Sequence, residues 1–210
     1  MLAAMAEVTR QASLGVLVTG NSYRNPHLLA DMARTVDHIS GGRLILGIGA
    51  GWYERDYREY GYRYGTMRER LDELELALPV IKERLAKLNP APVRGRIPIL
   101  IGAGGEKVAL RIVAEHADIW NSLGEPELIA RKGRVLDEWC ERIRRDPGEI
   151  VRSVLILDPE LVERADEYLE AGVTDLLVAV RAPDHDTAPL ERPIEWRDCR
   201  GTRSTDPRRR

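Results

Sequence analysis

Short apolar runs alternate with longer segments of helical periodicity along most of this 210-residue chain. The runs have the length of buried strands and occupy residues 14–18, 43–49, 98–102, 118–121, 153–157 and 175–180. Buried strands that alternate with helices predict a parallel sheet, either open or closed into a barrel. A parallel barrel closes with eight strand-then-helix units in about 250 residues. The six units of this chain therefore predict either an open sheet or a barrel that lacks two units.

Several helices have recognisable ends. Asn25 caps the first one and Pro26 suits its first position, whereas Gly41 and Gly42 stop it. A long amphipathic helix is predicted over about 66–87. Two shorter helices are predicted at about 126–144 and from Asp158-Pro159 to Gly172.

The character of the sequence changes near its end. Residues 194–210 have no periodicity and finish with three arginines. Segments of this composition do not bury enough apolar surface to fold. We therefore predict a domain over residues 1–193, followed by a disordered, arginine-rich tail over 194–210.

Composition and charge narrow the class of protein. A net charge of -2 gives no reason to expect binding to nucleic acid. No apolar stretch approaches the roughly 20 residues needed to span a bilayer, and the first residues do not resemble a signal peptide. Cys140 and Cys199 are too few for a disulfide framework, which favours a reducing compartment. We expect a cytoplasmic protein with a small-molecule substrate and no membrane partner, and a homodimer is left open.

A glycine cluster follows the strand at 43–49. Gly49, Ala50, Gly51 and Trp52 lie just past its carboxyl end, which is the end where parallel α/β folds bind ligands. Glycines there let a ligand approach the backbone, or they only permit a tight turn with positive φ. The residues alone do not separate these interpretations. A Rossmann fingerprint is absent, because its third glycine would stand at the position of Trp52.

Two further strand ends are candidates. Gly102, Ala103, Gly104 and Gly105 lead from a strand into a helix, where free N–H groups favour a phosphate, although a plain turn has the same pattern. Thr19 ends the first strand, so its hydroxyl is expected at the same edge of the sheet.

Charged residues near these strand ends are less informative. Lys107 adds positive charge or points to solvent, and Arg24 is interpreted as a surface charge. The acidic residues after Trp52 are interpreted as a solvated face; they are Glu54, Asp56 and Glu59.

Other kinds of catalytic site find no support. The four histidines have no metal-binding spacing, so no metal site is predicted. Cys140 lies within a predicted helix without an evident base, and no GxSxG motif occurs.

Residues 14–61, 98–124 and, more weakly, 168–183 resemble the bacterial-luciferase-like (LLM class) flavin monooxygenase superfamily. The match is best to its branch of oxidoreductases that use coenzyme F420. This resemblance implies an α/β fold of the (β/α)8 TIM-barrel type, incomplete at the N-terminus, with about six of eight units present. It also implies a flavin-type ring in the carboxyl-terminal mouth of the barrel.

The same resemblance assigns cofactor-binding residues. Thr19, Ala50, Gly51 and Trp52 correspond to positions beside the ring, and Gly102, Ala103, Gly104 and Gly105 to the loop around the phosphate. Some F420 enzymes have a glutamate proton donor where this chain has Trp52. No catalytic residue is therefore named.

The resemblance implies hydride transfer between a small organic substrate and coenzyme F420. An FMN-dependent luciferase-like monooxygenase is the alternative, because both cofactors share a ring outline and a phosphate. A truncated, non-catalytic family member or partner subunit is a third alternative, because two barrel units are missing from this chain. An NAD-binding open sheet is disfavoured by the failed Rossmann spacing.

Overall fold

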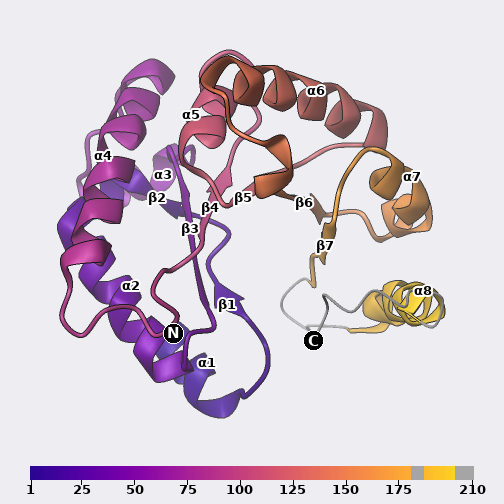
Figure 1. The fold of residues 1–210 in the computed structure, drawn as a ribbon, viewed down its shortest axis with the longest axis horizontal. Coiled ribbons are helices and arrows are strands. Elements are labelled where there is room, and N and C mark those ends of the chain that lie inside the picture. The colour runs from indigo at the N-terminus through magenta and orange to yellow at the C-terminus, as the bar shows by residue number, and fades with distance from the viewer. Residues whose placement is uncertain (181–186, 202–210) are drawn as a thin grey trace. The chain divides into compact units, whose positions relative to one another are not determined.

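A computed structural model describes residues 1–180 and 187–201 of the chain, and its helices and strands alternate (Figure 1). The elements that contain the first five predicted strands and their neighbours are α1 (Leu2–Val8), β1 (Leu14–Gly15), β2 (Thr19–Gly20), η1 (Asn21–Tyr23), α2 (Pro26–Ser40), β3 (Leu44–Gly49), α3 (Glu54–Tyr60), α4 (Met67–Lys87), β4 (Ile99–Gly102), α5 (Ala109–His116), β5 (Ile119–Ser122), α6 (Pro126–Ile143), η2 (Pro147–Glu149) and β6 (Val151–Ile156). The remaining elements are η3 (Pro159–Arg164), α7 (Ala165–Glu170), β7 (Asp175–Val178), η4 (Ala188–Leu190) and α8 (Glu191–Gly201).

The chain forms two compact units. The first comprises Met1–Asn121 and Arg134–Val151, and the second comprises Ser122–Gly133 and Arg152–Arg210. In the first unit β3 pairs in parallel with β1, β2 and β4, and β4 pairs in parallel with β5. The predicted first strand is thus two short pieces, with a cis peptide bond between Leu17 and Val18 in the interval.

The core of the first unit lies between its strands and the helices α2, α4 and α5. Ile48 of β3, Ile101 of β4 and Leu78 of α4 are completely or almost completely buried in one continuous cluster. Burial of a side chain of this size contributes about 1.5–3 kcal/mol. Helices α2 and α4 lie side by side in this unit (Figure 1).

The predicted helix ends are confirmed for α2 and α4. The side-chain oxygen of Asn25 accepts hydrogen bonds from the amides of His27 and Leu28, and Gly41 ends α2 with a φ of 67°. Helix α4 begins with a capping box, in which Thr66 and Glu69 each bond the other's backbone N–H. These local signals place the long helices where the sequence predicts them.

Two helices depart from expectation. Helix α5 begins at Ala109, so a turn separates it from Gly104-Gly105. The tail predicted at 194–210 is helical in its first part, because α8 extends through Gly201. Trp196 donates to Asp166 at 3.1 Å there, and Arg192 forms an ion pair with Glu163. Residues 202–210 lie outside the described residues.

The second unit has its own small core. Strands β6 and β7 pair in parallel, and Val154, Ile156 and Tyr168 are buried in a separate cluster. The hydroxyl of Tyr168 donates to the carbonyl of Gly124 at 2.8 Å. The candidate cofactor-binding residues all lie in the first unit.

Candidate functional site

The three predicted strand ends meet at one level of the sheet. Gly20 of β2 pairs with Gly49 of β3, the β3–β4 register places Gly49 beside Gly102, and Gly102 pairs with Asn121 of β5. Because these strands are parallel, their carboxyl ends share one edge. Thr19, the loop after β3 and the loop after β4 therefore lie at the same edge, as the sequence predicts.

A side chain occupies the space above two of the strand-end glycines. A β-carbon at Gly49 would lie 2.8 Å from Val18 Cγ2, and one at Gly102 would lie 3.3 Å from both methyl carbons of Val18. These glycines make room for Val18 rather than for a ligand that touches their backbone. The backbone open to a ligand therefore lies one or two residues further along each loop.

The loop after β3 comprises residues 51–65 and is called the aromatic loop here. It begins at Gly51, whose φ of 82° lies in the left-handed region. A β-carbon at Gly51 would lie 2.0 Å from the hydroxyl oxygen of Tyr57, which is buried. Both observations require glycine at this position.

The aromatic loop carries exposed rings. The side chain of Trp52 is 74% exposed and makes an edge contact with Tyr53, with ring centroids 5.3 Å apart. Tyr62 stacks on Tyr23 at 5.5 Å. The Tyr23 hydroxyl donates to Asp56, and burial followed by this hydrogen bond raises the pKa of Tyr23 to about 12. The loop thus has a packed tyrosine base and an uncovered indole.

Arg70 of α4 holds the ends of the aromatic loop. Its Nε donates to the carbonyl of Gly51 at 2.9 Å, and its Nη1 donates to the carbonyls of Tyr64 and Gly65 at 3.1 and 2.9 Å. The guanidinium also lies 4.0 Å from the centroid of the Tyr64 ring. The sequence does not reveal this role, because Arg68 and Arg70 both stand in the first turns of α4 and only burial distinguishes Arg70.

The loop after β4 comprises residues 102–108 and is called the glycine loop. Two buried or partly buried indoles hold its carbonyls: Trp120 Nε1 donates to the Ala103 oxygen and Trp139 Nε1 to the Glu106 oxygen, both at 3.0 Å. In a planar trans peptide the N–H points opposite to the C=O. The N–H groups of Gly104 and Lys107 consequently point away from the indoles, and both residues are exposed.

The other candidates have modest surroundings. The Thr19 hydroxyl accepts a hydrogen bond from Arg24 Nη1 at 3.0 Å. Arg24 is exposed, as predicted, and it also contacts a candidate residue. Ala50 and Ala103 are half-buried at the edge of the core cluster. Within residues 1–180 and 187–201, no group of acidic, histidine and cysteine side chains is placed to hold a metal ion. In the same residues no helix is both long and apolar enough to cross a membrane.

Comparison with known proteins supports the assignment of the fold and family. A family model described as luciferase-like monooxygenase matches residues 1–171. An uncharacterized protein of Mycobacterium tuberculosis is 31% identical over 215 residues, covering 92% of this chain and 72% of that protein. The 5,10-methylenetetrahydromethanopterin reductase of Archaeoglobus fulgidus is 36% identical over 130 residues, covering 56% of this chain and 38% of the reductase.

Solved structures show the fold. The coenzyme F420 dependent tetrahydromethanopterin reductase from Methanopyrus kandleri has a TM-score of 0.74 at 18% identity, over 90% of this chain and 83% of that one. The oxygenating constituent of 3,6-diketocamphane monooxygenase from Pseudomonas putida, in complex with FMN, has a TM-score of 0.72 at 15% identity, over 92% of this chain and 80% of that one. The predicted α/β fold of the TIM-barrel type, with six successive strand positions, is confirmed.

Proposed function

Because this chain belongs to the luciferase-like monooxygenase family, we propose that it is an oxidoreductase that transfers hydride between a small organic substrate and coenzyme F420. The observation that carries the proposal is the shared edge at which Thr19, the aromatic loop and the glycine loop meet. At this edge the aromatic loop offers a surface for the flat ring of the coenzyme, and the glycine loop offers one for its phosphate. The coenzyme F420 dependent reductase among the structural neighbours supports the choice of coenzyme.

The glycine loop fits a phosphate. Its outward N–H groups at Gly104 and Lys107 are donors for phosphate oxygens, and the exposed Lys107 side chain adds a positive charge. A β-carbon at Gly105 would meet only Ala109 Cβ at 3.7 Å, an ordinary contact. Gly102 and Ala103 then serve to position this loop, and Gly104 and Gly105 to contact the phosphate.

The aromatic loop fits the ring. Gly51 and Ala50 bring the backbone to the edge of the sheet, and Trp52 presents an uncovered indole beside it. Such an indole offers apolar area for stacking and reduces the access of water to the face it covers. When bound, the deazaflavin supplies the hydride-transferring carbon. This chain's residues bind and orient the coenzyme, and no proton donor is assigned.

An FMN-dependent monooxygenase is the second candidate. The structural neighbour that contains FMN favours it, and the glycine loop would hold the FMN phosphate in the same way. Neither reaction requires nucleic acid or a membrane as a partner.

The test is a titration of the purified chain with coenzyme F420 and with FMN, followed by calorimetry and cofactor fluorescence. Tighter binding of F420 together with substrate-dependent reduction of F420 supports the proposal. Binding of FMN alone, with oxygen consumption after reduction, selects the second candidate. Failure to bind either cofactor contradicts both.

A matched variant locates the phosphate. Because Gly105→Ala is accommodated in the unliganded fold, its thermal unfolding should match the parent protein. A loss of affinity in this variant would then report the approach of the ligand to the loop. Unchanged affinity would remove Gly105 from the proposed site.

A further inference from the structure

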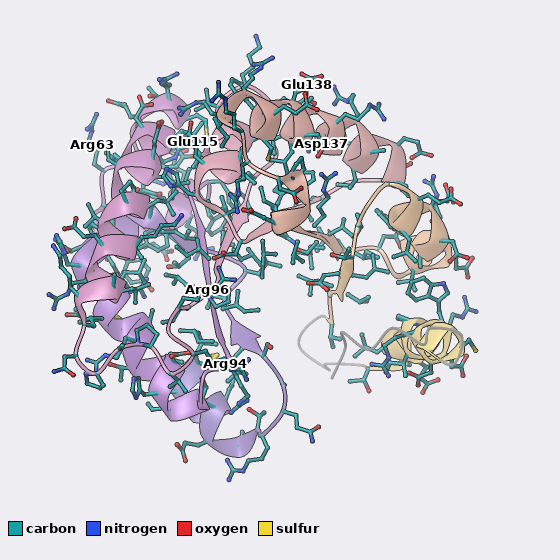
Figure 2. The ribbon with its side chains drawn as sticks, in the orientation of Figure 1. Arg63, Arg94, Arg96, Glu115, Asp137 and Glu138 are labelled. Atoms are coloured by element: carbon teal, nitrogen blue, oxygen red, sulfur yellow. The ribbon has the colours of Figure 1, made fainter. Side chains whose placement is uncertain are left out.

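Arg70 is a buried cation. Arg70 is only 3% exposed, and no carboxylate among the described residues forms an ion pair with it. Arg63, labelled in Figure 2, contrasts with it, because Arg63 is exposed and pairs with Glu69. Burial of a charge is costly unless hydrogen bonds replace its water. Backbone carbonyls and the ring of Tyr64 replace the water around Arg70.

These carbonyls belong to both ends of one loop. Gly51 begins the aromatic loop, and Tyr64 and Gly65 end it. The Tyr64 hydroxyl in turn donates to the carbonyl of Trp52 at 2.8 Å. Arg70 therefore closes the loop directly, and through Tyr64 it also restrains the residue that carries the exposed indole.

The geometry of the guanidinium explains the choice of residue. Its planar fork has donors in several fixed directions, whereas a lysine ammonium is a compact point donor on a flexible stem. Nε donates to the carbonyl of Gly51, while Nη1 donates to the carbonyls of Tyr64 and Gly65. One rigid group therefore bonds two separate segments of the chain. A lysine would have to reach the carbonyl oxygens of both segments from a single nitrogen atom.

We propose that Arg70 is a positioning residue that fixes Trp52 at the coenzyme face by closing the aromatic loop with its guanidinium. The proposal rests on the proposed function for the role of Trp52 but not for the closure itself. Arg70 acts through Gly51 and Tyr64, and we assign it no contact with the coenzyme.

Two variants test this role. Arg70→Lys retains the charge and loses the fork, and Tyr64→Phe removes only the hydroxyl that bonds the Trp52 carbonyl. Arg84→Lys is the matched control, because Arg84 also uses two nitrogens but binds the carboxylate of Asp31 away from the loop. Hydrogen exchange of amides in residues 51–65 is measured first, and the dissociation constants for F420 and FMN second.

We expect amide exchange in residues 51–65 to accelerate at least tenfold in Arg70→Lys and less in Tyr64→Phe, with α2 unchanged. Affinity for whichever cofactor binds should fall about tenfold in Arg70→Lys and about threefold in Tyr64→Phe. Arg84→Lys should change neither the exchange rate nor the affinity. Unchanged exchange, or faster exchange with unchanged affinity, would overturn the role of Arg70. If Arg70→Lys does not fold, Tyr64→Phe decides by the same two measurements. Accelerated exchange in a protein whose parent binds neither cofactor would overturn the proposed function while confirming the closure.

Discussion

The aromatic loop and the glycine loop follow the neighbouring strands β3 and β4. In both loops, side-chain N–H groups donate hydrogen bonds to backbone carbonyl oxygens. In the aromatic loop the donor is the guanidinium of Arg70, and in the glycine loop the donors are the indoles of Trp120 and Trp139. The aromatic loop is left with exposed side chains, of which Trp52 is the most prominent. The glycine loop is left with backbone N–H groups that point away from the indoles, at the exposed residues Gly104 and Lys107.

This difference teaches how one edge of a sheet can serve two kinds of chemistry. Side-chain rings offer apolar area, which suits a flat ring. Outward N–H groups offer partial positive charge, which suits an anion. Each prediction below changes a residue in one of the two loops or in an element that contacts or follows it.

The largest effect is expected for Gly51→Ala. The left-handed φ costs about 1–2 kcal/mol for a residue with a β-carbon, and overpacking against the Tyr57 hydroxyl adds about 1–3 kcal/mol. Chemical denaturation should therefore show a loss of roughly 2–5 kcal/mol in the free energy of unfolding.

The double variant Gly51→Ala/Tyr57→Phe separates these causes. It removes the atom that lies 2.0 Å from the new β-carbon and retains the strained φ. Part of the lost stability should return relative to Tyr57→Phe alone. An equal cost in both backgrounds would show that Tyr57 does not restrict position 51.

The next effect concerns the glycine loop. Trp139→Phe removes the donor to the Glu106 carbonyl, and loss of one such hydrogen bond is worth about 1 kcal/mol. If that bond orients the Lys107 amide, affinity for a phosphate-bearing cofactor should fall about fivefold by calorimetry. Exchange of the aromatic loop should stay unchanged.

Trp196→Phe is the control for this change. It also removes an indole donor, but the acceptor is Asp166 in the second unit. A similar loss of cofactor affinity in both variants would contradict the role assigned to Trp139.

A smaller effect is expected for Trp52→Ala. Because its side chain is 74% exposed, the free energy of unfolding should change by less than about 0.5 kcal/mol. Loss of stacking should weaken cofactor binding by about 0.5–1.5 kcal/mol. A spectroscopic titration checks the affinity, and unchanged affinity would exclude Trp52 from the ring surface.

The smallest effect concerns pH. His116 ends α5, the helix that the glycine loop precedes, and burial followed by the charge of Lys82 lowers its pKa below the ordinary value of about 6.5. The folded protein therefore favours the neutral imidazole, so stability is present above that value and declines as the pH falls below it. His116→Gln should flatten the decline of the melting temperature between pH 7 and 5 in paired melts, leaving cofactor affinity at pH 7 unchanged.

Much of this edge could be predicted from the sequence, because its signals are local. Asn25 and Pro26 mark a helix start, and a glycine cluster after an apolar run marks a strand end. Parallel strands then bring such ends together whatever the side chains are. The proposed cofactor class comes from family resemblance, because periodicity carries no information about it.

The support beneath the loops could not be predicted in this way. Trp139 and Glu106 are far apart in the sequence, and nothing in either segment shows that an indole meets a carbonyl. Arg70 looks like one charge among many in an amphipathic helix, and only burial distinguishes it. Helix α8 depends on contacts such as that of Trp196 with Asp166 rather than on its own periodicity.

Val18 has a consequence for redesign of this edge. Its methyl groups fill the space next to Gly49 and Gly102, and a β-carbon at Gly47 would lie 3.4 Å from Val18 Cγ1 and 1.9 Å from the Val16 carbonyl oxygen. The side-chain volume available at these positions of β3 and β4 therefore depends on the volume at position 18, which lies between β1 and β2. In a mutant library that varies these positions independently, most variants would have steric clashes. A library that pairs a smaller residue at position 18 with a larger one at 49 or 102 would avoid these clashes.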